Sequence, residues 1–171
     1  MVSTAAAVLL TIVLLISACT TSSPGETGTR VSEIAPDFRL QSLEGEMVNL
    51  GDLRGKVVLL NFWATWCGPC RDEMGYLEEV HREWTDRGLA LLAINVGETI
   101  PQVEDFMREF NLTLPVLLDG DMGVARIYNI TGYPTTFLID KNGIIQGKQI
   151  GAFPNTESIE VGLKKLIQVT P

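Results

Sequence analysis

Two long hydrophobic stretches indicate the centre of the fold. Residues Lys56 to Ala64 (KVVLLNFWA) and Leu89 to Val96 (LALLAINV) are almost continuously apolar. Such runs are typical of strands that are buried on both faces of a parallel sheet. The segment between them, Cys67 to Arg87, has apolar positions at helical spacing, which are Met74, Tyr76, Leu77, Val80 and Trp84. This pattern predicts a strand–helix–strand unit with parallel strands and a right-handed connection.

Shorter elements are predicted on either side of this unit. A small hairpin turning at Gly45 is expected near the N-terminus. A second helix is expected over Thr99 to Phe110, with Thr99 as its cap and Pro101 in its first turn. The remaining expected elements are a strand at 115–118, a short helix at 123–128, a hairpin of 135–139 and 144–150 that turns at Asn142-Gly143, and a terminal helix over 155–169. This order predicts a three-layer α/β domain with a mixed central sheet.

The beginning of the chain has a different pattern. Residues 1–25 contain no Asp, Glu, Lys or Arg, and Ala5 to Ile16 is apolar except for Thr11. This run is shorter than the roughly 20 residues that cross a bilayer, and it has the length of a signal-peptide core. It ends in Ile16-Ser17-Ala18-Cys19, which resembles a bacterial lipoprotein cleavage site. The resemblance implies a signal peptide over residues 1–18 and a lipid on Cys19.

Two other interpretations of this leader stay open. Cys19 could be incidental after an ordinary signal peptide, or the apolar run could remain as an uncleaved anchor. All three interpretations place the rest of the chain outside the cytoplasm. Residues 19–32 are rich in Ser, Thr, Gly and Pro, which predicts a flexible tether. The folded domain is therefore expected over residues 33–171.

Composition narrows the classes of function. The 171 residues contain 13 Lys and Arg against 21 Asp and Glu, and the net charge of −8 argues against a nucleic-acid-binding surface. A hydrophobic content of 46% argues against wholesale disorder. The three cysteines are an odd number, which does not suit a scaffold held by disulfides.

Two of the cysteines stand together at the expected start of the first helix, in Cys67-Gly68-Pro69-Cys70. Backbone N–H groups at a helix N-terminus stabilise a thiolate, so Cys67 is expected to have a lowered pKa and some exposure. Cys70 lies one turn inward and is expected to be less accessible. A disulfide across so few residues restricts little chain entropy and would be a weak structural crosslink. The pair therefore predicts redox chemistry.

Metal and haem sites are disfavoured by the same residues. A zinc site needs four ligands, and only Cys67, Cys70 and the single His81 are available once Cys19 is lipidated. Attachment of a c-type haem requires His after the second cysteine, where this chain has Arg71. Since His81 lies on the apolar stripe of the helix, it is expected to be packed or partly exposed and not catalytic. We expect neither a metal nor another cofactor.

The sequence resembles known proteins over residues 33 to about 168. The segment 62–70 (FWATWCGPC) resembles the active site of the thioredoxin fold, and 131–139 (TGYPTTFLI) resembles its cis-proline segment. The leader, the opening 35–38 (APDF), the extra helix and strand over 99–118, and 95–98 (NVGE) resemble the membrane-anchored TlpA/ResA-like branch. The resemblance implies a thioredoxin-like fold with an N-terminal hairpin and a helix–strand insertion.

The resemblance also implies roles for single residues. Cys67 is the attacking cysteine and Cys70 the resolving one. Pro134 is cis and, with Tyr133, holds the backbone of the substrate. Trp66 helps to form a docking surface, whereas Trp63 fits core packing equally well.

A buried acid of thioredoxin is missing here, since its position is occupied by Asn61. Glu73 matches an acidic residue of the ResA-like branch, three residues after Cys70. We expect Glu73 to take the proton of Cys70 during resolution. The alternative is that Glu73 is a solvated acid favoured by the helix dipole.

The implied activity is thiol–disulfide exchange with protein disulfides. The Gly-Pro dipeptide between the cysteines is that of thioredoxin, a reductant at about −270 mV, which favours the reducing direction. The branch implies a CcdA-type membrane protein as electron donor and the cysteines of apocytochrome c as substrate. Three alternatives stay open: an oxidase or isomerase for secreted proteins, a peroxidase, and a tethered binding domain with a vestigial disulfide. The P-x-x-x-T-x-x-C frame of peroxidases is absent, because Leu60 and Ala64 occupy its Pro and Thr positions.

Overall fold

The computed structural model describes residues 25–167, in which seven strands form one mixed sheet. The strand order is β2-β1-β5-β4-β3-β6-β7. Only β3–β4 and β4–β5 are parallel, and the other pairs are antiparallel. The strands are β1 (Arg39–Ser42), β2 (Met47–Asn49), β3 (Val57–Trp63), β4 (Leu89–Val96), β5 (Val116–Asp119), β6 (Thr135–Ile139) and β7 (Ile145–Ile150).

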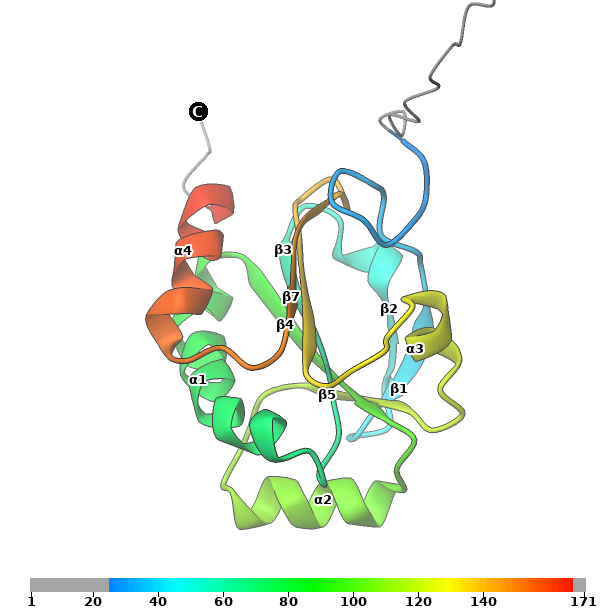
Figure 1. Ribbon diagram of the computed structural model, residues 1–171, viewed down its shortest axis with the longest axis vertical. Helices are drawn as coiled ribbons and strands as arrows, with labels where there is room; N and C mark the ends of the chain where they lie inside the picture. The colour runs from blue at the N-terminus through cyan, green and yellow to red at the C-terminus, as the bar shows by residue number, and fades with distance from the viewer. Residues whose placement is uncertain (1–24, 168–171) are drawn as a thin grey trace, which may run out of the picture.

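Helices cover both faces of the sheet and give three layers (Figure 1). Helices α1 (Gly68–Trp84) and α4 (Thr156–Ile167) lie on one face, and the short α3 (Gly123–Ile127) lies on the other. Successive side chains of β3 alternate between the two faces, because a strand has a period of two. Val57, Leu59 and Trp63 therefore join the core beneath α1, α2 (Ile100–Glu109) and α4, whereas Val58, Leu60 and Phe62 join the core beneath α3.

The predicted fold class is confirmed. The central strand–helix–strand unit has parallel strands, with Leu59 opposite Leu91. The N-terminal hairpin forms β1 and β2, and the inserted helix and strand form α2 and β5. Thr99 caps α2 in a reciprocal arrangement with Gln102. The predicted end of the last helix, at residue 169, lies outside the described residues.

The start of the folded part differs from the prediction. The tether was expected to reach residue 32, but its last eight residues, 25–32, are held against the domain by backbone hydrogen bonds. Gly28 N–H donates to Ile34 O at 3.0 Å, and Ser32 N–H donates to Ile145 O at 2.8 Å. Pairing with β7 thus orders a segment whose composition alone indicates flexibility. The expected signal peptide and Cys19 lie outside the described residues.

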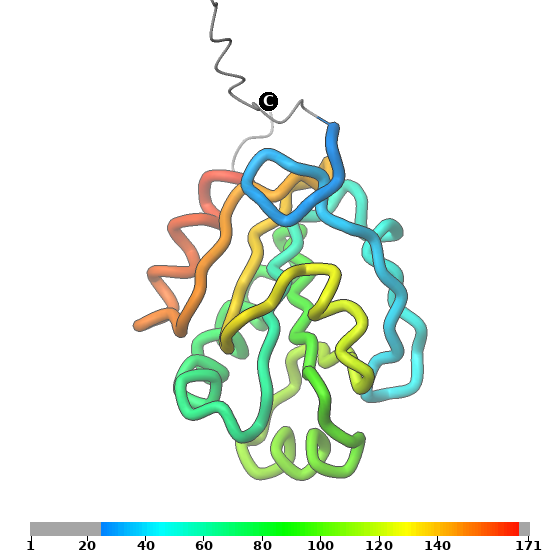
Figure 2. Tube along the Cα trace, turned by 45° about the vertical axis from the view of Figure 1, so that its right-hand side comes forward, coloured from blue at the N-terminus to red at the C-terminus, as the bar shows by residue number. Residues whose placement is uncertain are grey.

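The active-site motif and the start of the described chain lie at opposite ends of the domain. Figures 1 and 2 show the loop that leads from β3 into α1 close to α2, far from the first described residues and from the end of α4. None of the helices within residues 25–167 is long and apolar enough to cross a membrane.

Candidate active site

A disulfide joins Cys67 and Cys70 where β3 leads into α1. Cys67 is the N-cap of α1, and its Sγ accepts a hydrogen bond from the backbone N–H of Cys70 at 3.2 Å. Pro69 lies in the first turn, where its missing N–H leaves no helical hydrogen bond unmade. The N-cap sulfur is therefore placed where the free N–H groups and the dipole of a 17-residue helix stabilise a negative charge.

The two cysteine residues are less exposed than the motif alone predicts. Cys67 is 5% exposed and Cys70 is fully buried, so the expected order holds, although we had expected Cys67 to be more open. The neighbouring Trp66 is 69% exposed and meets the Tyr133 ring edge-on, with 5.8 Å between centroids. The Tyr133–Pro134 peptide bond is cis, as the resemblance implies. Trp66 and Tyr133 thus form an aromatic surface next to the Cys67 loop.

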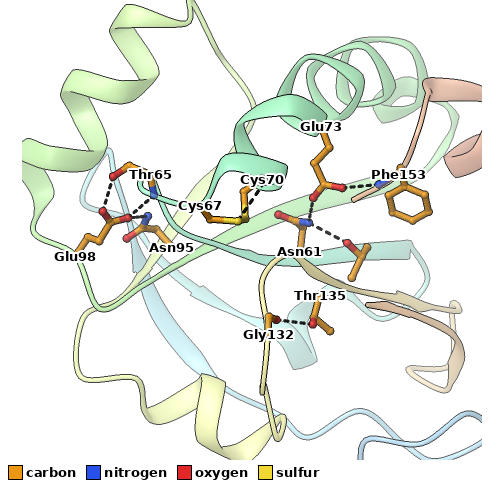
Figure 3. Close-up of a disulfide and its surroundings, with 11 residues drawn as sticks. Asn61, Thr65, Cys67, Cys70, Glu73, Asn95, Glu98, Gly132, Thr135 and Phe153 are labelled. Carbon is orange, nitrogen blue, oxygen red and sulfur yellow. Dashed lines mark hydrogen bonds between the residues drawn. A yellow bond between two sulfur atoms is a disulfide. The ribbon is translucent and has the colours of Figure 1, made fainter. Parts of the chain in front are cut away.

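Glu73 is buried beneath the helix start and is not a solvated surface acid. It lies three residues after Cys70, so both side chains project from the same face of α1. Its Oε1 accepts from Asn61 Nδ2 at 2.8 Å, and its Oε2 accepts from the backbone N–H of Phe153 at 2.9 Å (Figure 3). Burial raises the pKa of Glu73 to about 7, although both hydrogen bonds act to lower it. A carboxyl group with this pKa can both accept and release a proton near neutral pH.

A second carboxylate fixes the loop before Cys67. Glu98 accepts from the backbone N–H of Thr65 at 2.7 Å, from the Thr65 hydroxyl at 2.5 Å and from Asn95 Nδ2 at 2.7 Å (Figure 3). These three hydrogen bonds connect the end of β4 to the loop that carries Trp66 and Cys67. The position of the N-cap sulfur therefore depends on both parallel strands.

Comparison with known proteins agrees with this geometry. The model of the AhpC/TSA family matches residues 31–148. The chain belongs to the AhpC/TSA family. The chain is 46% identical over 121 residues to the thiol-disulfide oxidoreductase ResA of Geobacillus kaustophilus, covering 71% of this chain and 70% of that protein. It is 42% identical over 140 residues to the thioredoxin-like protein YneN of Bacillus subtilis, covering 80% and 81%.

Solved structures place this family member among thioredoxin-fold oxidoreductases. A thiol:disulfide interchange protein of Chlorobium tepidum is 31% identical with a TM-score of 0.71, covering 78% of this chain and 95% of that one. The exposed lipoprotein thioredoxin Etrx1 of Streptococcus pneumoniae is 29% identical with a TM-score of 0.65, covering 77% and 100%. With these relatives and its Cys67–Cys70 pair, the chain is a thiol-disulfide oxidoreductase.

Other residues considered from the sequence have structural positions. Trp63 is fully buried and packs on Phe106, with 5.0 Å between ring centroids, so it belongs to the core. His81 is partly exposed and its Nδ1 lies 3.1 Å from the Thr85 hydroxyl, far along α1 from the cysteines. Among residues 25–167, no three His, Cys, Asp or Glu side chains are grouped as metal ligands would be.

Sequence reasoning underestimated Asn61. It was interpreted only as the position of a missing acid, but its amide is the direct partner of Glu73 and of Thr136, whose Oγ1 accepts at 2.9 Å. A signal was present in the sequence, because Asn61 is the one polar residue of β3, VVLLNFW. A polar side chain inside a fully buried strand needs a hydrogen-bond partner, so Asn61 indicates a second polar group in the core.

Proposed function

We propose that the protein reduces disulfides of other proteins outside the cytoplasm while anchored to the membrane by a lipid on Cys19. The N-cap position of Cys67, with Glu73 buried behind Cys70, carries the proposal. The Cys67 thiolate attacks a substrate disulfide, and one substrate sulfur leaves as a thiol. Cys70 then gives its proton to Glu73 and attacks Cys67 Sγ, which releases the second substrate sulfur and forms the Cys67–Cys70 disulfide.

The reducing direction is supported by the residues between the cysteines. Gly68 and Pro69 are the dipeptide of thioredoxin, which is a reductant. A thiolate that is strongly stabilised makes a dithiol more oxidising, because the reduced form is then favoured. Cys67 Sγ accepts a hydrogen bond from a neutral group, the backbone N–H of Cys70.

The membrane anchor is supported by the leader and by one relative. The apolar run that ends at Ala18-Cys19 has the form of a lipoprotein signal, and the Streptococcus pneumoniae neighbour is described as an exposed lipoprotein. The first described residues lie at the end of the domain opposite the cysteine pair (Figure 1). A tether attached there would hold the active site away from the bilayer, toward soluble or exported partners.

The proposed partners follow from the ResA-like branch. We infer that the substrate is a protein disulfide, with the cysteine pair of apocytochrome c as the first candidate. A CcdA-type membrane protein would return electrons to the Cys67–Cys70 disulfide. The net charge of −8 favours substrates with neutral or basic residues around their cysteines.

Trapping in cells tests this proposal. Full-length Cys70→Ser should accumulate mixed disulfides through Cys67, since nothing resolves them, and the captured proteins should be exported ones recovered from the membrane fraction. The Cys67→Ser, Cys70→Ser double variant is the matched control and should capture nothing. Capture of cytoplasmic proteins alone, or recovery of the complexes from the soluble fraction, would contradict the proposed location and anchor.

A further inference from the structure

Three buried side-chain polar atoms among the described residues have no hydrogen-bond partner, namely Asn61 Oδ1, Trp63 Nε1 and Asn95 Oδ1, and the first of them belongs to the Glu73 network. Asn61 is fully buried, and its Nδ2 donates to Glu73 Oε1 at 2.8 Å and to Thr136 Oγ1 at 2.9 Å. Its Oδ1 accepts no hydrogen bond from any described residue. A buried acceptor without a donor is unfavourable by about 1–3 kcal/mol, so such an atom needs an explanation.

The unpartnered oxygen faces the cysteine side of the network. Asn61 lies on β3 between Leu59 and Trp63 in the alternation of faces, and both of these belong to the core cluster that contains Cys67 and Cys70. In Figure 3 the Nδ2 of Asn61 is directed at Glu73, and the Oδ1 is directed toward the disulfide. The structure holds the oxidised pair, and a disulfide has no hydrogen to donate. Reduction creates the thiol of Cys70 and thereby a donor for this oxygen.

We propose that Asn61 is a positioning residue that bridges Cys70 and Glu73. Its amide can hydrogen-bond to both groups before the proton moves from Cys70 to Glu73 and again afterwards. With the Cys70 thiol protonated and Glu73 ionised, Asn61 Oδ1 accepts from the S–H, and its Nδ2 donates to the carboxylate. After the proton has moved to Glu73, the amide turns by half a turn about its last bond. Nδ2 then donates to the Cys70 thiolate, and Oδ1 accepts from the new O–H of Glu73.

The step balances without another reactant. The proton leaves Cys70 Sγ and ends on a Glu73 oxygen, while Asn61 stays a neutral amide with both of its own protons. The electron pair of the thiolate forms the bond to Cys67 Sγ, and the bond between Cys67 and the substrate sulfur breaks with its pair on the leaving sulfur. That sulfur takes up a proton from Glu73 or from water. An amide suits the bridging position because it carries a donor and an acceptor on one rotatable group, whereas a carboxylate there would place a second negative charge beside Glu73.

The other groups that contact Asn61 and Glu73 are not able to accept the proton of Cys70. The partners recorded for the two polar ends of the network are Thr136 and the backbone N–H of Phe153. Neither of them titrates, and no charged side chain contributes to the raised pKa of Glu73, which comes from burial. The proton of Cys70 is thus coupled to Glu73 through Asn61, and loss of the amide should affect resolution but not the first attack.

Two-phase kinetics with an aromatic disulfide reagent test this inference, which rests on the proposed order of attack. The reagent releases one coloured thiol when Cys67 attacks it and a second when Cys70 resolves the adduct, so stopped-flow absorbance separates the two steps. With reduced full-length protein, Asn61→Leu should slow the second phase by about tenfold or more and leave the first within about twofold. Asn61→Ser should behave in the same way, since a hydroxyl is too short to span both partners.

Leu60→Ala is the matched control. Leu60 precedes Asn61 on β3 but faces the opposite core, so its truncation loosens the strand without touching the network. Thermal unfolding should show that this variant is less stable, and its second phase should stay within about twofold of the wild-type rate. The inference fails if both Asn61 variants slow the two phases equally, if their second phase is unchanged, or if Leu60→Ala slows it as much.

The order of attack is tested separately in the same assay. Cys70→Ser should keep the first phase and lose the second, whatever the Asn61 variants do. Should Cys67→Ser keep the first phase instead, the proposed order is wrong, and with it the basis of this inference. A normal Cys70→Ser result together with unaffected Asn61 variants would overturn the bridge alone.

Discussion

Replacing Cys67 with serine is expected to abolish reduction of insulin disulfides, leaving the rate seen with dithiothreitol alone. Cys67 is the N-cap of α1, and its sulfur accepts the backbone N–H of Cys70, so it is the sulfur that the helix start stabilises as a thiolate. A serine hydroxyl at the same place remains protonated near neutral pH and forms no mixed disulfide. Turbidity of precipitating insulin B chain measures the rate directly.

Cys70→Ser distinguishes loss of attack from loss of resolution. This variant should also fail to turn over, but it should form a stable adduct with a small disulfide, which mass spectrometry detects as an increase in mass on Cys67. Cys67→Ser should form no such adduct. If a limiting thiol reagent alkylated Cys70 before Cys67 in the reduced wild-type protein, the two roles would have to be exchanged.

Glu73→Gln is expected to remove a pH dependence of stability worth about 2 to 3 kcal/mol between pH 5 and pH 8. Burial raises the pKa of Glu73 from 4.5 to about 7 in the folded protein. As the pH rises between these values, the unfolded chain releases this proton first, so the folded state binds more protons and loses stability. Urea unfolding of the oxidised wild type and variant at both pH values gives the difference, which should shift in favour of the variant at pH 8.

Glu78→Gln is the control for this experiment, since Glu78 is on the same helix. Although burial acts to raise it, the pKa of Glu78 is lowered overall, by hydrogen bonds from Thr113 and from the backbone of Leu114. The stability that Glu78 contributes is therefore present above its unfolded pKa and is lost only at more acidic pH. Glu78→Gln should change stability equally at pH 5 and pH 8. A Glu73→Gln difference that is also equal at the two values would show that Glu73 titrates normally.

The sequence was sufficient for the fold because its hydrophobic runs are long and unambiguous. Residues 57–63 and 89–96 had to be buried strands, and the helix between them required a parallel pairing. Pairing of β1 with β5, where Gln41 lies opposite Leu118, was not predicted. Which strands pair when they are distant in sequence is decided by the assembled sheet. The hydrophobic pattern of either strand does not indicate its partner.

The site residues that are close together in the sequence could be predicted, but the contacts between separate helices and strands could not. Cys67, Cys70 and Glu73 share one helix start, so their spacing alone brings them together. The hydrogen bonds to Glu73 come from Asn61 on β3 and from Phe153 before α4, and the second donor is a backbone group that no residue type reveals. The burial that raises the pKa of Glu73 is likewise a property of the packed domain.

The reduction potential of the Cys67–Cys70 pair tests the central claim most directly. Trp66 lies next to Cys67 and is largely exposed, so tryptophan fluorescence is expected to report the redox state during titration against thiol buffers. A protein that works as a reductant should have a midpoint near or below that of thioredoxin, at about −270 mV. A midpoint near that of the strong oxidant DsbA, at about −120 mV, would contradict the account and identify an oxidase.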